Sequence, residues 1–129
     1  EKAPAMFYFL DMVSRLHGRA GFEAVNDGIN EHLRSNGKQV DCVIALNIFH
    51  HFLKDRRGWE NLNEVAELLD CKEMFFQMAN DKTLGKFGGG WKKTADVIDL
   101  FRDKAGLKNV VQIGREHNRN IYHMTRNGA

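Results

Sequence analysis

Residues 40–52 read Val-Asp-Cys-Val-Ile-Ala-Leu-Asn-Ile-Phe-His-His-Phe, and this stretch decides the fold. Its first ten residues form a nearly continuous apolar run that only Asp41 and Asn47 interrupt. Such runs are typical of parallel strands that are covered on both faces, whereas a half-exposed strand alternates apolar and polar residues. The pattern therefore predicts a strand over residues 40–49 at the centre of a mostly parallel sheet.

Helical and extended patterns alternate on both sides of this stretch. Apolar spacing and turn residues predict helices over 5–16, 29–34, 59–69 and 91–105, and strands over 22–25, 40–49, 73–79, 110–113 and 121–124. The segment 81–90 contains Gly and Lys and is expected to be a loop. The polar connection 114–120 is too short for a crossover helix, so the last two strands should form an antiparallel hairpin. The order predicts a three-layer α/β domain with right-handed crossovers.

Length and composition limit the class of protein. The 129 residues, 43% of them hydrophobic and 28% charged, suit one globular domain over 1–129. Nineteen Lys and Arg residues against seventeen Asp and Glu residues give a net charge of +2, which does not favour nucleic acid as a partner. No apolar run reaches the roughly 18 residues of a membrane span, so we expect a cytoplasmic protein. Cys42 and Cys71 are expected to be reduced thiols in the core.

Open α/β sheets bind ligands beyond the carboxyl ends of their strands. Three polar segments follow predicted strands and are therefore candidate ligand contacts. They are residues 26–28, 47–51 and 79–81.

Residues 41–52 resemble the fourth-strand motif of class I S-adenosylmethionine-dependent methyltransferases, in which an Asp enters an apolar strand that ends in Asn, an apolar pair and His-His. Residues 1–6, 22–28, 73–79 and 110–126 resemble other segments of the same family. The family's Gly-rich cofactor loop would precede Glu1. The resemblance therefore implies an incomplete domain without its first two strands. Its open sheet edges and uncovered face would need an N-terminal segment, a partner chain or a swapped dimer.

The resemblance also assigns roles to the cofactor-binding residues. Glu1 would accept hydrogen bonds from the ribose hydroxyls, Asp27 would accept one from the adenine amino group, and the Gly28 backbone would approach the ring. Asn47 would hold the methionine moiety or the methyl acceptor. The alternatives are a solvated terminal charge for Glu1, a turn and helix cap for Asp27 and Gly28, and a turn cap for Asn47.

Asn47, His50 and His51 are the candidate catalytic residues. An imidazole with its usual pKa near 6.5 accepts a proton from a hydroxyl or amine at neutral pH. Alternatively, one ring packs in the core and the other caps a turn. Two adjacent histidines are poorly placed to chelate one metal, and no metal site is expected.

Three functions remain open from the sequence. The first is methyl transfer from S-adenosylmethionine to a small-molecule, sugar or lipid acceptor, with residues 82–91 either closing over that acceptor or forming a plain surface loop. The second is a non-catalytic α/β module that docks on a partner chain. The third is a subunit of an RNA-modifying methyltransferase.

Overall fold

The computed structural model describes residues 28–36, 39–88 and 92–126. The chain divides into two units, Glu1–Asn36 and Gly37–Ala129. Helix α2 (Ile29–Asn36) belongs to the first unit and confirms the helix predicted over 29–34. The predicted helix over 5–16, the strand over 22–25, and the residues Glu1 and Asp27 lie outside the described residues.

The second unit contains a four-stranded mixed sheet. Its strands are β1 (Val40–Leu46), β2 (Cys71–Gln77), β3 (Asn109–Glu116) and β4 (Arg119–Thr125), in the spatial order β1-β2-β4-β3. The pairing of β1 with β2 is parallel, and the other two pairings are antiparallel. The predicted α/β class and the closing antiparallel hairpin are confirmed. Among the described strands, however, only one pairing of three is parallel.

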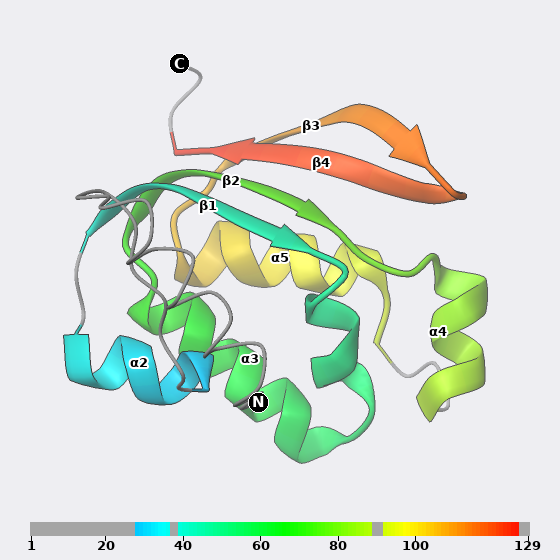
Figure 1. The fold of residues 1–129 in the computed structure, drawn as a ribbon, viewed down its shortest axis with the longest axis horizontal. Helices are drawn as coiled ribbons and strands as arrows, with labels where there is room; N and C mark the ends of the chain where they lie inside the picture. The colour runs from blue at the N-terminus through cyan, green and yellow to red at the C-terminus, as the bar shows by residue number, and fades with distance from the viewer. Residues whose placement is uncertain (1–27, 37–38, 89–91, 127–129) are drawn as a thin grey trace, which may run out of the picture. The chain divides into compact units, whose positions relative to one another are not determined.

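The helices of this unit cover one face of the sheet. They are η1 (Phe49–Leu53), α3 (Arg56–Leu68), α4 (Asp81–Gly88) and α5 (Thr94–Lys104). Helices α3 and α5 lie beneath the sheet in Figure 1. Their buried side chains, such as Leu62 and Phe101, pack with the helix-facing residues Met74, Phe76 and Met124 of the sheet, all 0% exposed. This apolar layer is the core, and it holds the strand ends in place.

The opposite face of the sheet carries a row of mostly apolar side chains across all four strands, which we call the apolar row; its one imidazole, His123, pairs with Glu73 at 2.8 Å. In register, Ile44 is next to Phe75, Phe75 next to His123, and His123 next to Val111. Ile44 is 66% exposed and Val111 is 58% exposed. The prediction that the run at 40–49 is covered on both faces is therefore wrong for the described structure. The reason is that β1 is an edge strand there, with β2 as its described neighbour, and the helices of this unit pack on the other side.

Strand β1 is also shorter than predicted. It ends at Leu46, because Asn47 adopts a positive φ of 57°, a left-handed conformation that breaks the extended ladder. The rest of the apolar run becomes the short helix η1, whose Phe49 stacks on Phe101 at 5.0 Å between ring centroids. Cys71 is buried as expected, but Cys42 is exposed, so its assignment to the core is wrong.

The segment after β2 is a helix, and the prediction of a loop over 81–90 is wrong for residues 81–88. Asn80 starts α4: its side-chain Oδ1 accepts a hydrogen bond from Thr83 N at 2.9 Å, and its carbonyl accepts one from Leu84 N. Leu84 is 4% exposed and anchors the helix on the core. An N-cap and one buried apolar residue thus overcome the low helix propensity of Gly85.

Candidate functional site

Three chain segments meet at one end of the sheet, which we call the carboxyl edge because the parallel strands finish there. The parallel strands β1 and β2 both finish there, and β4 begins there because it runs antiparallel to β2. The hairpin joining β3 to β4 turns through His117 and Asn118, which both have positive φ values (51° and 62°). Two left-handed residues in a two-residue loop are typical of a type I′ turn. The tight turn brings the start of β4 to the same edge as the carboxyl ends of β1 and β2.

Asn47 is the centre of a polar network at this edge. Its backbone N donates to the carbonyl of Gln77 at 2.6 Å, and its Nδ2 donates to Gln77 Oε1 at 3.4 Å. Arg119 Nη1 donates to Asn47 Oδ1 at 2.6 Å. Both polar atoms of the Asn47 side chain are thereby engaged, which stabilises the left-handed conformation that ends β1.

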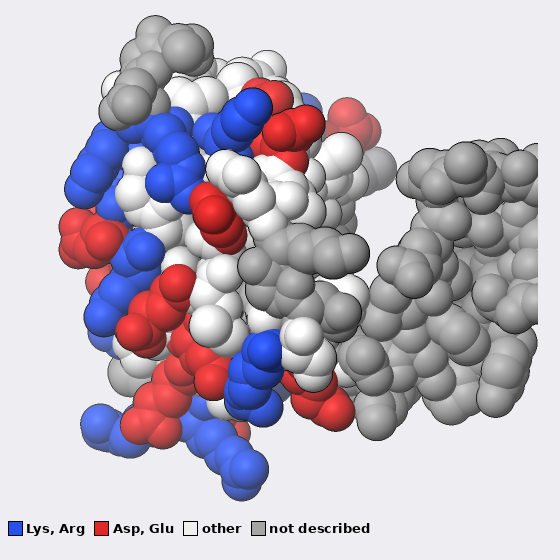
Figure 2. Space-filling model, turned by 90° about the vertical axis from the view of Figure 1, so that its left-hand side faces the viewer, with Lys and Arg blue, Asp and Glu red and all other residues white. Residues whose placement is uncertain are grey.

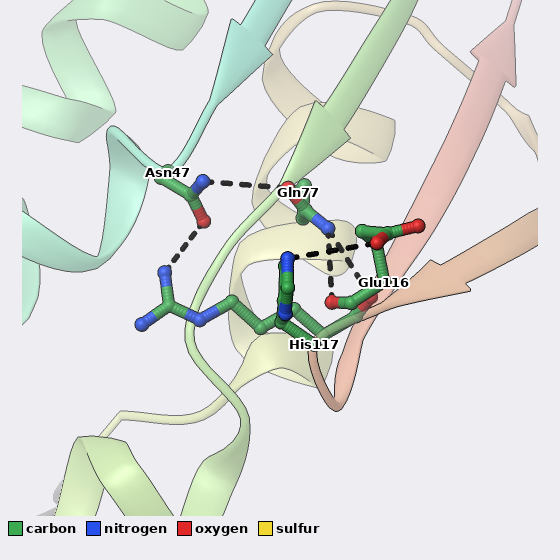
Figure 3. A network of polar contacts seen from close by, with 5 residues as sticks. Asn47, Gln77, Glu116 and His117 are labelled. Carbon is green, nitrogen blue, oxygen red and sulfur yellow. Dashed lines mark hydrogen bonds and ion pairs between the residues drawn. The ribbon is translucent and has the colours of Figure 1, made fainter.

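Gln77 joins β1 to the hairpin. It is only 8% exposed, and its Nε2 lies 3.3 Å from the carbonyl of Arg119 and 3.4 Å from that of Glu116. Figure 3 shows Asn47, Gln77, Glu116 and His117 converging from the strand ends and the turn. We call Asn47, Gln77, Glu116 and Arg119 the strand-end network. Because a buried amide must be hydrogen-bonded, this network fixes the relative positions of the three segments.

His50 and His51 follow the network on η1 and have different environments. Their rings lie 4.2 Å apart between centroids, but His50 is 7% exposed whereas His51 is exposed. Phe49 also packs against Phe76, with ring centroids 5.7 Å apart, and so anchors η1 on the core. The buried ring is therefore held rigidly beside the strand ends, and the exposed ring faces solvent.

Burial lowers the pKa of the His50 imidazole from its ordinary value of 6.5 to about 4. Burial is the largest cause of this shift in pKa, and the nearby His51, Arg119 and Lys54 contribute to the same lowering. His50 is consequently neutral at pH 7. A neutral imidazole is able to accept a hydrogen bond or a proton, although a pKa near 4 makes it a weak base.

The structure brings together the predicted residues Asn47, His50 and His51. Gly28 lies in the other unit, directly before α2, and its carbonyl accepts a hydrogen bond from His32 N at 3.0 Å. Sequence reasoning missed Gln77 and Arg119. Only their positions could have indicated these two residues, because Gln77 ends the strand that pairs with β1 and Arg119 begins the strand that pairs with β2.

Other kinds of site have little support among the described residues. There, no three His, Cys, Asp or Glu side chains are arranged to hold a metal ion. The helices of residues 28–36, 39–88 and 92–126 are all too short or too polar to cross a membrane. On the face drawn in Figure 2, the described Lys and Arg side chains are interspersed with Asp and Glu rather than gathered in one stripe.

No protein-family model matches this sequence, and no curated protein matches it significantly. Two solved structures do resemble the fold. The crystal structure of WbdD matches with a TM-score of 0.66 and 16% identity over 89% of this chain and 27% of that chain. The N-methyltransferase NodS from Bradyrhizobium japonicum WM9 matches with a TM-score of 0.57 and 15% identity over 86% of this chain and 62% of that chain.

This chain thus spans about a quarter of one matched protein and less than two thirds of the other. The likeness covers most of the length of this chain, 89% and 86%. The chain has a class I methyltransferase-like fold.

Proposed function

We propose that this chain is part of a methyltransferase that transfers a methyl group from S-adenosylmethionine to a small-molecule, sugar or lipid acceptor in the cytoplasm. The observation that carries the proposal is the fold likeness to NodS, an N-methyltransferase, at a TM-score of 0.57. The strand-end network supports it, because this edge of an open α/β sheet is where ligands bind. We further propose that residues 1–129 form a single domain.

In this proposal four residues hold the cofactor. Glu1 would bind the ribose hydroxyls, Asp27 the adenine amino group, the Gly28 backbone the ring, and Asn47 the methionine moiety. The described geometry allows one refinement. Arg119 and Gln77 each use one hydrogen-bonding position of the Asn47 side chain, so a second Nδ2 proton and a second Oδ1 lone pair would remain for the methionine moiety.

The bound cofactor supplies an activated methyl group, so the protein mainly has to align the acceptor and exclude water. The candidate proton acceptors are the neutral, buried His50 and the exposed His51. His50 lies on a rigid element next to Asn47, which suits a hydrogen bond that orients the acceptor. His51 is accessible to solvent, which suits the release of a proton.

Calorimetric titration with S-adenosylmethionine tests the proposal, on the 129-residue chain and on its full parent gene product. Binding by either protein supports the proposal, and binding by the longer product alone locates the rest of the cofactor site outside these residues. The absence of binding by both would overturn it. In an active protein, His50→Gln and His51→Gln should lower kcat with little change in cofactor affinity.

A non-catalytic module that docks on a partner chain or on a second copy is the alternative function. The exposed Ile44 and Val111 of the apolar row favour it, because exposed large apolar side chains on a sheet face are common at protein interfaces. The same titration separates the two candidates. A module of this kind would not bind the cofactor even as the full gene product.

A further inference from the structure

A polar pocket of about 160 Å³ lies beside the strand-end network. Its polar lining comes from Asn80, Asp81, Thr94, Asn120 and Tyr122. Met78 and Ala79, which are 2% and 0% exposed, complete the wall at the end of β2. The volume is well above the roughly 10–15 Å³ that a single water molecule needs, and it is below the roughly 300 Å³ of a drug-sized site. The pocket therefore suits a small ligand or the end of a larger one.

The pocket is built from fixed elements. Tyr122 stacks on the buried Phe76 at 5.2 Å between centroids, so its ring position is set by the core. Asp81 Oδ1 accepts a hydrogen bond from Thr94 N at 3.0 Å, which ties the start of α4 to the start of α5. Asn80 Nδ2 donates to the carbonyl of Asn118 in the hairpin turn at 3.3 Å. This last bond connects the pocket to the strand-end network.

The hydrogen bonds determine what the pocket offers to a ligand. Asn120 Oδ1 accepts from Gln112 Nε2 at 3.1 Å, and Asn120 Nδ2 donates to the Tyr122 hydroxyl oxygen at 3.2 Å. Since that oxygen already accepts one bond, the hydroxyl proton of Tyr122 is directed elsewhere and is available to a ligand acceptor. The second carboxylate oxygen of Asp81 makes no hydrogen bond to the described residues, so it remains available to a ligand donor.

The charge of the pocket lining indicates the chemical class of the ligand. Asp81 is the one charged residue among those that line the pocket. A carboxylate favours ammonium and hydroxyl donors and disfavours carboxylate or phosphate ligands. A ligand with neighbouring amino and hydroxyl groups would satisfy both Asp81, as acceptor, and Tyr122, as donor.

We propose that this pocket binds a small amino- or hydroxyl-bearing compound, such as an amino alcohol or an amino sugar, in preference to an anion. Its role as the binding site of the methyl acceptor rests on the proposed function. The binding itself does not, because every residue of the pocket belongs to the described second unit and no cofactor takes part.

Amide NMR titration of the complete 129-residue chain with glucosamine, ethanolamine and glycerol 3-phosphate tests the proposal. We expect saturable shifts from the two amines at Asn80, Asp81, Thr94 and Asn120, and weaker or no saturable shifts from the phosphate. Asp81→Asn should weaken amine binding about threefold, a modest effect because the carboxylate is exposed. Asp99→Asn, an exposed charge on α5, should leave amine binding unchanged and serves as the matched control.

Tyr122→Phe keeps the ring in the core and removes only the hydroxyl, so it provides a second variant if Asp81→Asn disturbs the fold. We expect about threefold weaker binding of glucosamine. Unsaturable shifts, shifts centred on other residues, or tighter binding of glycerol 3-phosphate would overturn the proposal. Because these titrations contain no S-adenosylmethionine, failure of the pocket and failure of the cofactor titration are separate results.

Discussion

Arg119 at the start of β4 donates a hydrogen bond to Asn47 at the end of β1, at 2.6 Å and across 72 residues of sequence. This contact and the Gln77 amide join the only parallel strand pair among the described strands to the hairpin. The position of the candidate site therefore depends on the hairpin as much as on the motif that surrounds Asn47.

Replacement of Arg119 by Met should loosen this edge of the sheet. A hydrogen bond from a charged donor contributes about 1.5–3 kcal/mol, and partial exposure reduces the expected loss of unfolding free energy to about 1 kcal/mol. Urea denaturation of the wild type and of Arg119→Met measures this loss of unfolding free energy. Arg115→Met is the matched control, because Arg115 contacts only Asn118 within its own turn, at 3.3 Å, among the bonds described here. Equal losses in the two variants would contradict a special role for Arg119.

Asn47 should tolerate Gly better than Ala. Both variants lose the bonds to Arg119 and Gln77, but only Gly adopts a φ of 57° without steric cost. We expect the free energy of unfolding to be about 1 kcal/mol lower for Asn47→Ala than for Asn47→Gly. Thermal or urea unfolding of both variants checks this order. The reverse order would mean that the left-handed conformation does not persist in solution.

His50 should make the folded state sensitive to acid. The pKa of His50 is about 4 in the folded chain and 6.5 ordinarily, so the unfolded chain binds a proton first as the pH falls. The contribution of the neutral His50 to the free energy of unfolding is complete above pH 6.5 and is lost as the pH falls from 6.5 to 4. At about 1.4 kcal/mol for each pH unit, the total loss is about 3 kcal/mol.

Unfolding free energies measured from pH 7.5 to 4 test this dependence. His50→Gln should flatten the pH profile over that window, whereas His51→Gln, at the exposed neighbouring position, should retain it. A wild-type profile that is already flat would show that His50 is not held neutral by burial.

Two helical glycines should respond to Ala in opposite directions. A Cβ on Gly58 of α3 would clash with the carbonyl oxygen of Phe52, whereas a Cβ on Gly85 of α4 would have nothing within 4 Å. Gly58→Ala should therefore destabilise the chain by more than about 2 kcal/mol. Gly85→Ala should stabilise it by about 0.5–1 kcal/mol, because Ala has the higher helix propensity. Calorimetric melting of both variants measures these shifts.

The sequence predicted the elements whose side chains repeat with a clear period. The helix over 59–69 and the hairpin strands appear within a few residues of their expected limits, because burial of one face imposes that period. The end of β1 was not predictable in this way. Ile48 and Phe49 continue the apolar run, and only the left-handed Asn47 separates the strand from η1.

The candidate site was predicted in part. A motif within a few residues identifies Asn47, His50 and His51, but the contacts of Gln77 and Arg119 depend on strand register between distant segments. Burial of His50 rather than His51 depends on how Phe49 packs against Phe76 and Phe101, which no local pattern encodes.

The apolar row across the open face also governs how the chain behaves at high concentration. Ile44 and Val111 are exposed apolar side chains on the two outer strands β1 and β3, and exposed apolar side chains on edge strands promote self-association and precipitation. Lys at either position should raise the solubility limit while changing the melting temperature little. Such variants would be the practical starting material for crystallisation.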